Sequence, residues 1–185
     1  PKPADAAKPT KMDLEASPKL SISLNGPDSF KGRKVGCLVT DGTDIALVKA
    51  LKVALEKEGA LIEFVAPTVG GVEASDGTWI EAKQKINGGP SVLYDAVAIL
   101  PGPDGVDTLA NEATAKDFVN DAFAHAKFIA YAKSAMTLFE KAGVKSDMDG
   151  GFVELKAAKD AQAFVTACRN LRFWAREPKV HAAWA

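Results

Sequence analysis

The sequence predicts a three-layer α/β fold, in which a mostly parallel sheet carries helices on both faces. Short apolar runs such as "KVGCLVT" and "AVAIL" recur along the chain and are typical of strands that are covered on both sides. Amphipathic stretches of helical length lie between these runs, and the connections are short and marked by glycine. Strands that alternate with helices in this way favour parallel pairing.

Residues 1–32 are expected to form an extended linker before the folded body. Three prolines occur within the first ten positions, and the stretch shows little helical or strand periodicity. One extended piece is expected from Leu20 to Leu24. The chain starts without an initiator Met and without an apolar signal-peptide core, so we expect it to continue a longer polypeptide.

The body is expected to span residues 33–178 and to begin with the strand "KVGCLVT". The turn "DGTD" follows, with Asp44 or Thr43 as the cap of a helix that ends at Gly59. The broad apolar face of this helix includes Leu47 and Val53. "ALIEFVAP" is the second strand, and "GGVEASDGTWIEA" predicts a hairpin around "DGT".

The second half of the body continues the alternation. "AVAIL" is a buried strand, "PGPDG" is a loop, and a helix is expected from about Asn111 to His125. "KFIAYA" is a strand, "SAMTLFEKAG" a helix and "GFVEL" a strand. One last helix, "KDAQAFVTACRNLRFWARE", is expected to close the body, and residues 179–185 form a C-terminal tail.

Composition excludes several classes of function. Hydrophobic residues make up 47% of the chain and charged residues 25%, with a net charge of -1, so no electrostatic attraction to nucleic acid or anionic membrane is expected. No apolar run reaches the roughly 18 residues that span a bilayer. Cys37 and Cys168 lie in apolar elements without a CxxC spacing, which indicates buried thiols in a reducing, cytoplasmic compartment.

Familiar ligand motifs are absent. In this architecture sites form where strands end, which points to the loops 40–44, 67–71, 101–105 and 133–135. No GxGxxG follows the first strand, no phosphate-binding GxxxxGK[ST] occurs, and no GxSxG elbow is found. "TDGTD" loosely resembles a flavin phosphate loop, but its two aspartates would repel a phosphate.

The two histidines, His125 and His181, show no metal-ligand spacing, so no metal or cofactor site is predicted. We expect both to be capping or surface residues. The three tryptophans, Trp79, Trp174 and Trp184, are interpreted as packing residues rather than as a ligand box.

The two strands "YDAVAIL" and "KFIAYA" and their turns resemble flavodoxin-like, class I glutamine amidotransferase-like domains of the PfpI type. In that family a cysteine follows the second of these strands, a glycine lies close after it, and a glutamate supports the thiol. The resemblance places the cysteine position on Lys133, the glycine position on Ala135 and the glutamate near Leu47, with Asp44 close by. An ammonium that is protonated at neutral pH cannot replace a thiolate nucleophile, so no catalytic residue is predicted. The resemblance also implies a strained backbone at Lys133, whose stem would fill the pocket while its ammonium meets Asp44 or solvent.

A narrower resemblance covers most of the chain. "SPKLSI", "FKGRKVG", "GGPSVLYDAV", "KFIAYAKSA" and "RFWAREPKV" are similar, in order, to the C-terminal region of large-subunit catalases. In those haem enzymes a flavodoxin-like domain follows the catalase core through a long linker. The haem ligands belong to the core, and Tyr94 and Tyr131 lack their context, so this chain is expected to bind no haem and not to decompose peroxide alone.

This resemblance implies a non-catalytic accessory domain. Its role would lie in assembly, in stability or in access to the haem, with the catalase core and its homotetramer as partners. The alternative is a chaperone-like holdase or a partner-binding module, because PfpI-type relatives include chaperone-like proteins. A residual enzyme built on Lys133 is a third, weaker hypothesis, since a buried lysine can become a nucleophilic amine.

Overall fold

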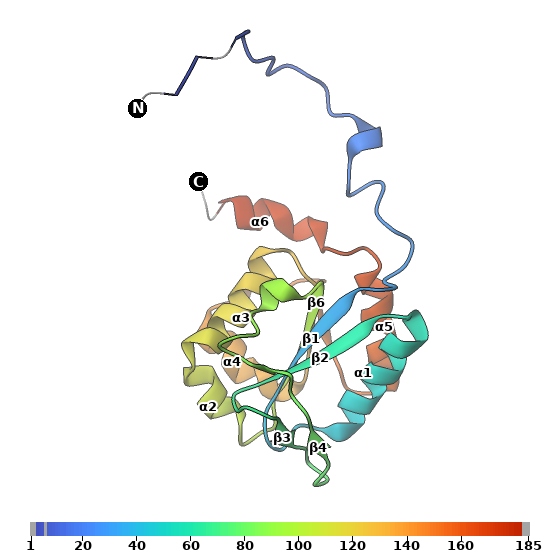
Figure 1. Ribbon diagram of the computed structural model, residues 1–185, viewed down its shortest axis with the longest axis vertical. Coiled ribbons are helices and arrows are strands. Elements are labelled where there is room, and N and C mark those ends of the chain that lie inside the picture. Colours follow the sequence, from blue (N-terminus) through green and yellow to red (C-terminus); the bar gives the residue numbers. More distant parts are fainter. Residues whose placement is uncertain (1–2, 6, 183–185) are drawn as a thin grey trace.

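The computed structural model describes residues 3–5 and 7–182, and its body is a three-layer α/β domain (Figure 1). Six strands form one sheet in the order β5-β2-β1-β6-β7-β8, and every neighbouring pair is parallel. The strands are β1 (Lys34–Val39), β2 (Leu61–Ala66), β5 (Gln84–Lys85), β6 (Ala96–Leu100), β7 (Ile129–Tyr131) and β8 (Phe152–Glu154). A separate antiparallel hairpin joins β3 (Val72–Glu73) to β4 (Trp79–Ile80). The predicted α/β fold and hairpin are therefore confirmed.

Helices cover both faces of the sheet. The helices are α1 (Ile45–Glu58), α2 (Val106–Asn111), α3 (Ala113–Ala124), α4 (Met136–Ala142), α5 (Ala158–Cys168) and α6 (Glu177–Ala182). Helices α1 and α5 pack on one face, and α2, α3 and α4 pack on the other (Figure 1). Along the described residues, no helix has the length and apolarity that crossing a membrane requires.

The strands contribute side chains to two hydrophobic cores, one on each face of the sheet, because successive side chains along a strand point to opposite faces. Cys37 and Val39 of β1 pack in the core under α1 and α5, whereas Leu38 packs under α2, α3 and α4. The central strand β6 is buried at every position, which matches its continuous apolar sequence.

Helix α1 has the ends that the sequence predicts. The Asp44 side chain accepts a hydrogen bond from Ala46 N (2.8 Å), and Gly59 ends the helix in the left-handed region at φ 74°. The apolar face is narrower than expected, because Val53 is 63% exposed while Leu51 and Leu55 are buried. At 3.6 residues per turn, Val53 is rotated away from the stripe that the sheet covers.

The linker differs from the sequence prediction in two places. The extended piece expected from Leu20 to Leu24 is wrong: a short 3₁₀ helix, Pro18–Leu20, is followed by turns that the Asn25 side chain closes by donating to Pro18 O (2.7 Å) and Ser21 O (2.8 Å). A β-strand needs a neighbouring strand to pair its backbone groups, and no described strand pairs with this segment. Phe30, inside the expected linker, is fully buried, and its N–H donates to Glu58 Oε1 (3.0 Å).

The expected closing helix is also wrong in its extent. Helix α5 ends at Cys168, and the chain turns at Leu171, which has a left-handed backbone (φ 61°). Beyond that turn, Phe173 N donates to Ala126 O (2.7 Å) and Arg176 is buried, so tertiary contacts override helical periodicity. Helix α6 then occupies the first part of the expected tail, whereas residues 183–185, including Trp184, lie outside the described residues.

Two short elements were missed in the sequence. Strand β5 has only two residues and pairs with Val65 and Ala66. Helix α2 begins directly after Gly105 in the expected loop "PGPDG". A side chain at Gly105 would collide with Thr40 Oγ1 at 2.2 Å, so close packing against the first loop permits only glycine here.

Candidate functional site

An open hollow of about 630 Å³ lies at the carboxyl ends of β1, β6, β7 and β8, where the architecture predicts a site. Three of the four loops singled out in the sequence contribute to its wall. The lining residues are Gly42, Asp44, Leu47, Ser75, Leu100, Pro101, Pro103, Ala132, Lys133, Ser134, Glu154, Leu155 and Lys156. The sequence therefore located this end of the molecule correctly, although it missed the contribution of the loop after β8.

Lys133 begins a 3₁₀ helix, Lys133–Ala135, directly after β7, and its side chain is exposed. The strained backbone expected there is absent: apart from glycines, only Ala126 and Leu171 have a positive φ among the described residues. No ion pair joins Lys133 to Asp44 within the same described part of the chain. The ammonium thus reaches solvent, and the hollow beside it stays open.

The two residues after Lys133 are engaged within the protein. The Ser134 hydroxyl donates to Pro101 O at 2.6 Å, which ties this turn to the neighbouring loop. Ala135 is fully buried, and its N–H donates to Ala132 O at 2.9 Å. In an oxyanion hole such amides must point at the developing negative charge. Here the amide at the glycine position closes its own turn instead.

The acid position is occupied by an apolar side chain. Leu47 is half-buried, packs against the core and lines the hollow. Asp44 is used as the cap of α1. Glu154, at the end of β8, is the further carboxylate in the wall, and it pairs with Lys156 at 2.8 Å. Sequence reasoning overlooked Glu154, although its place at the end of a predicted strand was a usable signal.

The hydroxyls of the first loop hold the loop itself. Thr43 Oγ1 lies 2.6 Å from Leu100 O and 2.8 Å from Thr40 O, and Thr40 Oγ1 accepts from Gly102 N at 2.8 Å. A side chain at Gly102 would meet Asp41 O at 2.1 Å. The loops after β1 and β6 are therefore packed too closely to leave these hydroxyls for a phosphate.

The residues that the sequence named as ligand candidates do not converge. The imidazole Nδ1 of His125, at the end of α3, lies 2.7 Å from Asp121 O, which makes His125 a capping residue as expected. The side chain of His181 lies outside the described part of the chain. Among described residues no group of three or more His, Cys, Asp or Glu could hold a metal ion.

Neither tyrosine has the surroundings of a haem ligand. The Tyr94 hydroxyl donates to Glu63 Oε1 at 2.8 Å, and the Tyr131 ring packs edge-on against Phe139. Cys37 and Cys168 are both fully buried and unpaired, and burial raises the pKa of each thiol above its usual range. Both cysteines are therefore unreactive core residues.

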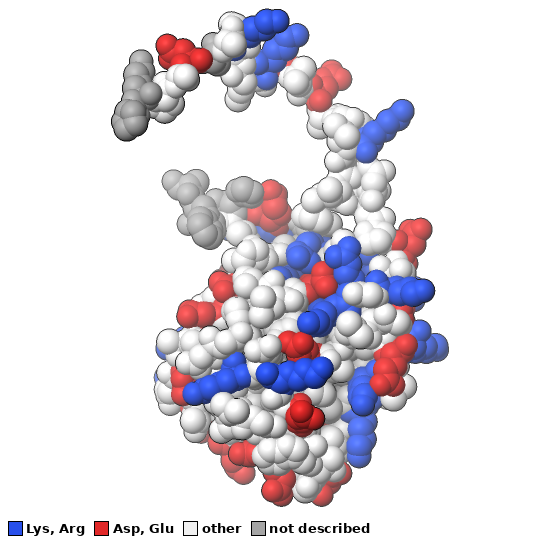
Figure 2. All heavy atoms as spheres, in the orientation of Figure 1, with Lys and Arg blue, Asp and Glu red and all other residues white. Residues whose placement is uncertain are grey.

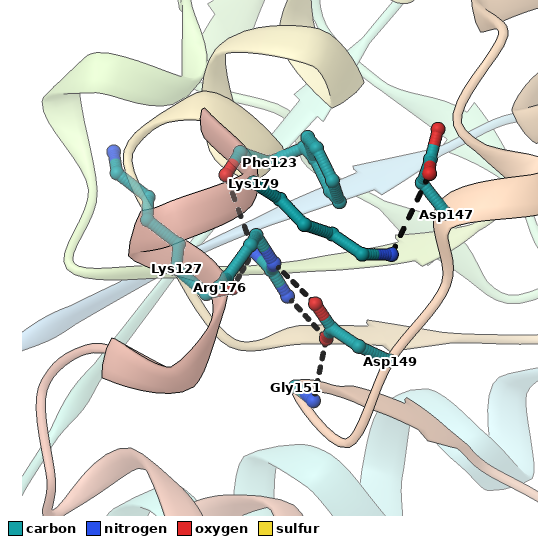
Figure 3. Close-up of polar contacts among 7 residues, drawn as sticks. All are labelled: Phe123, Lys127, Asp147, Asp149, Gly151, Arg176 and Lys179. Carbon is teal, nitrogen blue, oxygen red and sulfur yellow. Dashed lines mark hydrogen bonds and ion pairs between the residues drawn. The ribbon is translucent and has the colours of Figure 1, made fainter. Parts of the chain in front are cut away.

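A heavily hydrogen-bonded polar group lies elsewhere, at Arg176, which entered the sequence analysis only as part of the stretch "RFWAREPKV". Its side chain is fully buried, and the guanidinium donates to both carboxylate oxygens of Asp149 (2.8 and 2.9 Å), as Figure 3 shows. It also donates to Lys127 O (2.9 Å) and Phe123 O (3.3 Å). Although burial opposes ionisation, hydrogen bonds from Arg176 and from Gly151 N–H hold the pKa of Asp149 below its usual value.

This bonding makes Arg176 an anchor for the C-terminal segment rather than a catalytic group. The rings of Phe123, Phe152 and Phe173 surround its guanidinium at 4.7, 5.1 and 5.7 Å. A second ion pair, from Lys179 to Asp147 (3.5 Å), holds α6 beside the same loop (Figure 3). The segment after α5 is thus fastened to the strand β8 edge of the sheet.

The fold defines a class first: this is an α/β domain in which a parallel, flavodoxin-type sheet carries helices on both faces. It is similar to solved structures of oxidised Toxoplasma gondii DJ-1 (TM-score 0.62, 18% identity, 83% of this chain and 98% of that chain) and Drosophila melanogaster DJ-1beta (TM-score 0.62, 14% identity, 83% and 97%). At these identities the likeness concerns the fold alone. The family follows from sequence: residues 31–178 match the C-terminal domain found in long catalases, and the chain belongs to that family.

Curated relatives agree with this assignment. The chain is 55% identical to Catalase C of Rhizobium meliloti over 180 residues, which is 97% of this chain and 26% of that protein. It is 32% identical to Catalase HPII of Mycobacterium avium, over 86% of this chain and 25% of that protein. The chain therefore spans about a quarter of the length of the curated relatives that it matches.

Proposed function

We propose that this chain is a non-catalytic accessory domain of a long haem catalase, which decomposes hydrogen peroxide to water and oxygen in a separate core. The observation that carries the proposal is the family match, together with an exposed lysine at the position of the family thiol. The domain would contribute to assembly, stability or access to the haem, and haem would belong to the core alone.

Exposed apolar side chains in the linker support the proposal that this domain associates with the catalase core of the parent chain and with its homotetramer. Five large apolar side chains of this segment are 71–88% exposed: Met12, Leu14, Leu20, Ile22 and Leu24. Single exposed apolar residues are ordinary, but a run of them on a segment without a core indicates a surface that another part of a larger assembly covers. In this proposal residues 1–32 join the body, residues 33–178, to the catalase core, and residues 179–185 are the tail.

The test compares the full-length parent catalase with a form that lacks the body. We expect both to decompose peroxide, and we expect the truncated form to lose tetramer stability on heating. The 185-residue chain alone should be colourless and should release no oxygen from peroxide. A Soret band after incubation with haem, or oxygen release above buffer, would contradict the proposal. Unchanged assembly and thermal resistance of the truncated form would exclude a bracing role.

The exposed apolar side chains of the linker also favour a second function, a chaperone-like holdase. Apolar side chains held out on a polar segment can cover exposed surface on unfolding proteins. The measurement is light scattering by an unrelated protein on heating, with the 185-residue chain and with a variant in which Leu20, Ile22 and Leu24 are serine. Suppression that this variant loses would support the holdase, and equal scattering in all samples would dismiss it.

The proposed compartment is the cytoplasm. Its support is that Cys37 and Cys168 are both buried without a disulfide, which suits a reducing environment.

A further inference from the structure

A second crevice, of about 370 Å³, lies where the linker meets the body, at the opposite end of the strands from the Lys133 hollow. Linker residues form one wall, and residues that precede β1 and β6 or follow α5 form the other. The lining residues are Ile22, Asn25, Gly26, Pro27, Arg33, Asp95, Leu171, Arg172 and Trp174. In Figure 1 this junction lies at the end of the body from which the blue linker departs, away from the β3–β4 hairpin.

Arg172 is the central charge of this crevice, and a strained turn places it there. Leu171 adopts a left-handed backbone (φ 61°), which is unfavourable for a residue that carries a Cβ. After this turn, Arg172 Nη1 donates to Asp95 O (3.0 Å) and to Leu171 O (2.8 Å). Its Nε and Nη2 groups make no hydrogen bond to a described residue, although the side chain is half-buried. The fork of the guanidinium thus remains available to a ligand.

The charges around Arg172 are not balanced. Asp95 is the carboxylate of the crevice, and its two oxygens already accept from Arg33 (3.1 Å) and from Lys34 N (3.0 Å). Lys127 is 2% exposed and donates to the carbonyls of Ser91 (2.6 Å) and Tyr94 (2.7 Å), and no carboxylate of a described residue forms an ion pair with it.

The pKa directions agree with an excess of positive charge. Burial, followed by the charge of Arg172, lowers the pKa of Lys127 to about 8, against opposing contributions from Asp95 and Asp121. Burial also lowers the pKa of Arg172, where Asp95 opposes it and Arg33 adds to it. Figure 2 shows Lys and Arg side chains gathered just below the junction of linker and body. Cations held close together in a partly desolvated crevice attract an anion.

We propose that this crevice is a binding site for an oxyanion, a carboxylate or a phosphate group, held by the free edge of the Arg172 guanidinium with Arg33 at the rim. The planar fork of arginine matches both groups in a bidentate geometry. The half-buried Trp174 side chain gives the site an apolar wall for the carbon part of an organic anion. Because Asn25 and Pro27 form the opposite wall, a bound anion would also hold the linker against the body.

The experiment measures thermal unfolding and heats of binding of the 185-residue chain with inorganic phosphate and, separately, with succinate. Sodium chloride keeps the ionic strength constant, which removes general screening. We expect a saturable rise in Tm with at least one anion beyond the chloride control. A response to phosphate alone assigns a phosphate ligand, and a response to succinate alone assigns a carboxylate. No saturable response to either anion would overturn the proposal.

Two variants and a control locate the site. We expect Arg172→Gln to weaken the apparent affinity at least about tenfold, which corresponds to about 1.4 kcal/mol. Arg33→Gln, at the exposed rim, should weaken it less and keeps the test valid if the first variant does not fold. The matched control is Arg169→Gln, because Arg169 lies three positions away and is paired with Glu58 at 2.6 Å, outside the crevice. Undiminished binding in folded Arg172→Gln or in Arg33→Gln, or equal loss in the control, would refute the assignment.

Discussion

Replacing Arg176 with glutamine should remove a large part of the stability of this domain. The Arg176 side chain is fully buried, and its guanidinium forms hydrogen bonds to Asp149, Lys127 O and Phe123 O. Glutamine is shorter and uncharged, so it cannot keep these contacts, and it leaves the Asp149 carboxylate partly buried without its counter-charge. The variant therefore combines the loss of hydrogen bonds with an uncompensated charge.

The expected cost follows from the burial of the pair. Removing one partner of a buried ion pair destabilises a protein by about 3–5 kcal/mol. Three phenylalanine rings within 5.7 Å of the guanidinium add contacts that glutamine does not restore. Since a domain of this size is stable by about 5–15 kcal/mol, the variant should lose about a fifth of the total or more. In a thermal scan each kcal/mol corresponds to about 2–4 °C, so Tm should fall by about 10 °C.

Urea unfolding followed by far-ultraviolet circular dichroism measures this loss directly. Asp149→Asn and the double variant complete a cycle, in which we expect a coupling of at least about 2 kcal/mol because the two side chains share two hydrogen bonds. The control is Lys145→Gln, which breaks an exposed pair with Glu140 and should leave the free energy of unfolding nearly unchanged, because solvent screens such a pair. A loss below about 1 kcal/mol in Arg176→Gln, with an unchanged urea dependence, would refute the reasoning.

Three further predictions concern other parts of the chain. Gly36→Ala should destabilise by about 1–3 kcal/mol in urea unfolding, because a Cβ there would lie 2.2 Å from the Tyr94 ring; an effect below about 0.5 kcal/mol would be contrary to that packing. Burial lowers the pKa of Lys127 to about 8 in the folded state, below its unfolded value, so the unfolded chain binds more protons between about pH 8 and 10.5. The free energy of unfolding, measured against Lys127→Met, should therefore rise with pH across that window, and a flat difference would contradict a buried ammonium. Lys133→Ala should change stability by no more than about 1 kcal/mol, and borohydride should trap no small carbonyl compound on Lys133; trapping that the substitution abolishes would revive an enzymatic role.

Local patterns determined the layers of this protein. The apolar run of β6 and the alternation of strands with helices predicted a parallel, doubly covered sheet, because those patterns follow from backbone geometry. The Asp44 cap and the Gly59 end of α1 were also predictable, since a cap depends on residues within one turn. Three of the loops that line the Lys133 hollow were also predicted, because sites lie where parallel strands end, whereas the contribution of the loop after β8 was missed.

Tertiary contacts decided what the sequence left open. The helical pattern of "KDAQAFVTACRNLRFWARE" continues past Cys168, yet the chain turns at Leu171 because Phe173 and Arg176 find partners across the body. No local pattern shows that Arg176 is buried, since its acceptors on Phe123, Lys127 and Asp149 lie 27 to 53 residues away.

The crevice around Arg172 was likewise invisible in the sequence. Its walls come from the linker, from the residues before β1 and β6, and from the turn after α5, which meet only in the folded chain. Residue types alone predict an arginine at a solvated surface, whereas its half-burial beside Arg33 and Asp95 depends on long-range packing. The sequence by itself therefore determined the layers and the end of the sheet at which the Lys133 hollow lies. The tertiary structure decided which charged side chains are enclosed, because enclosure depends on neighbours that are distant along the chain.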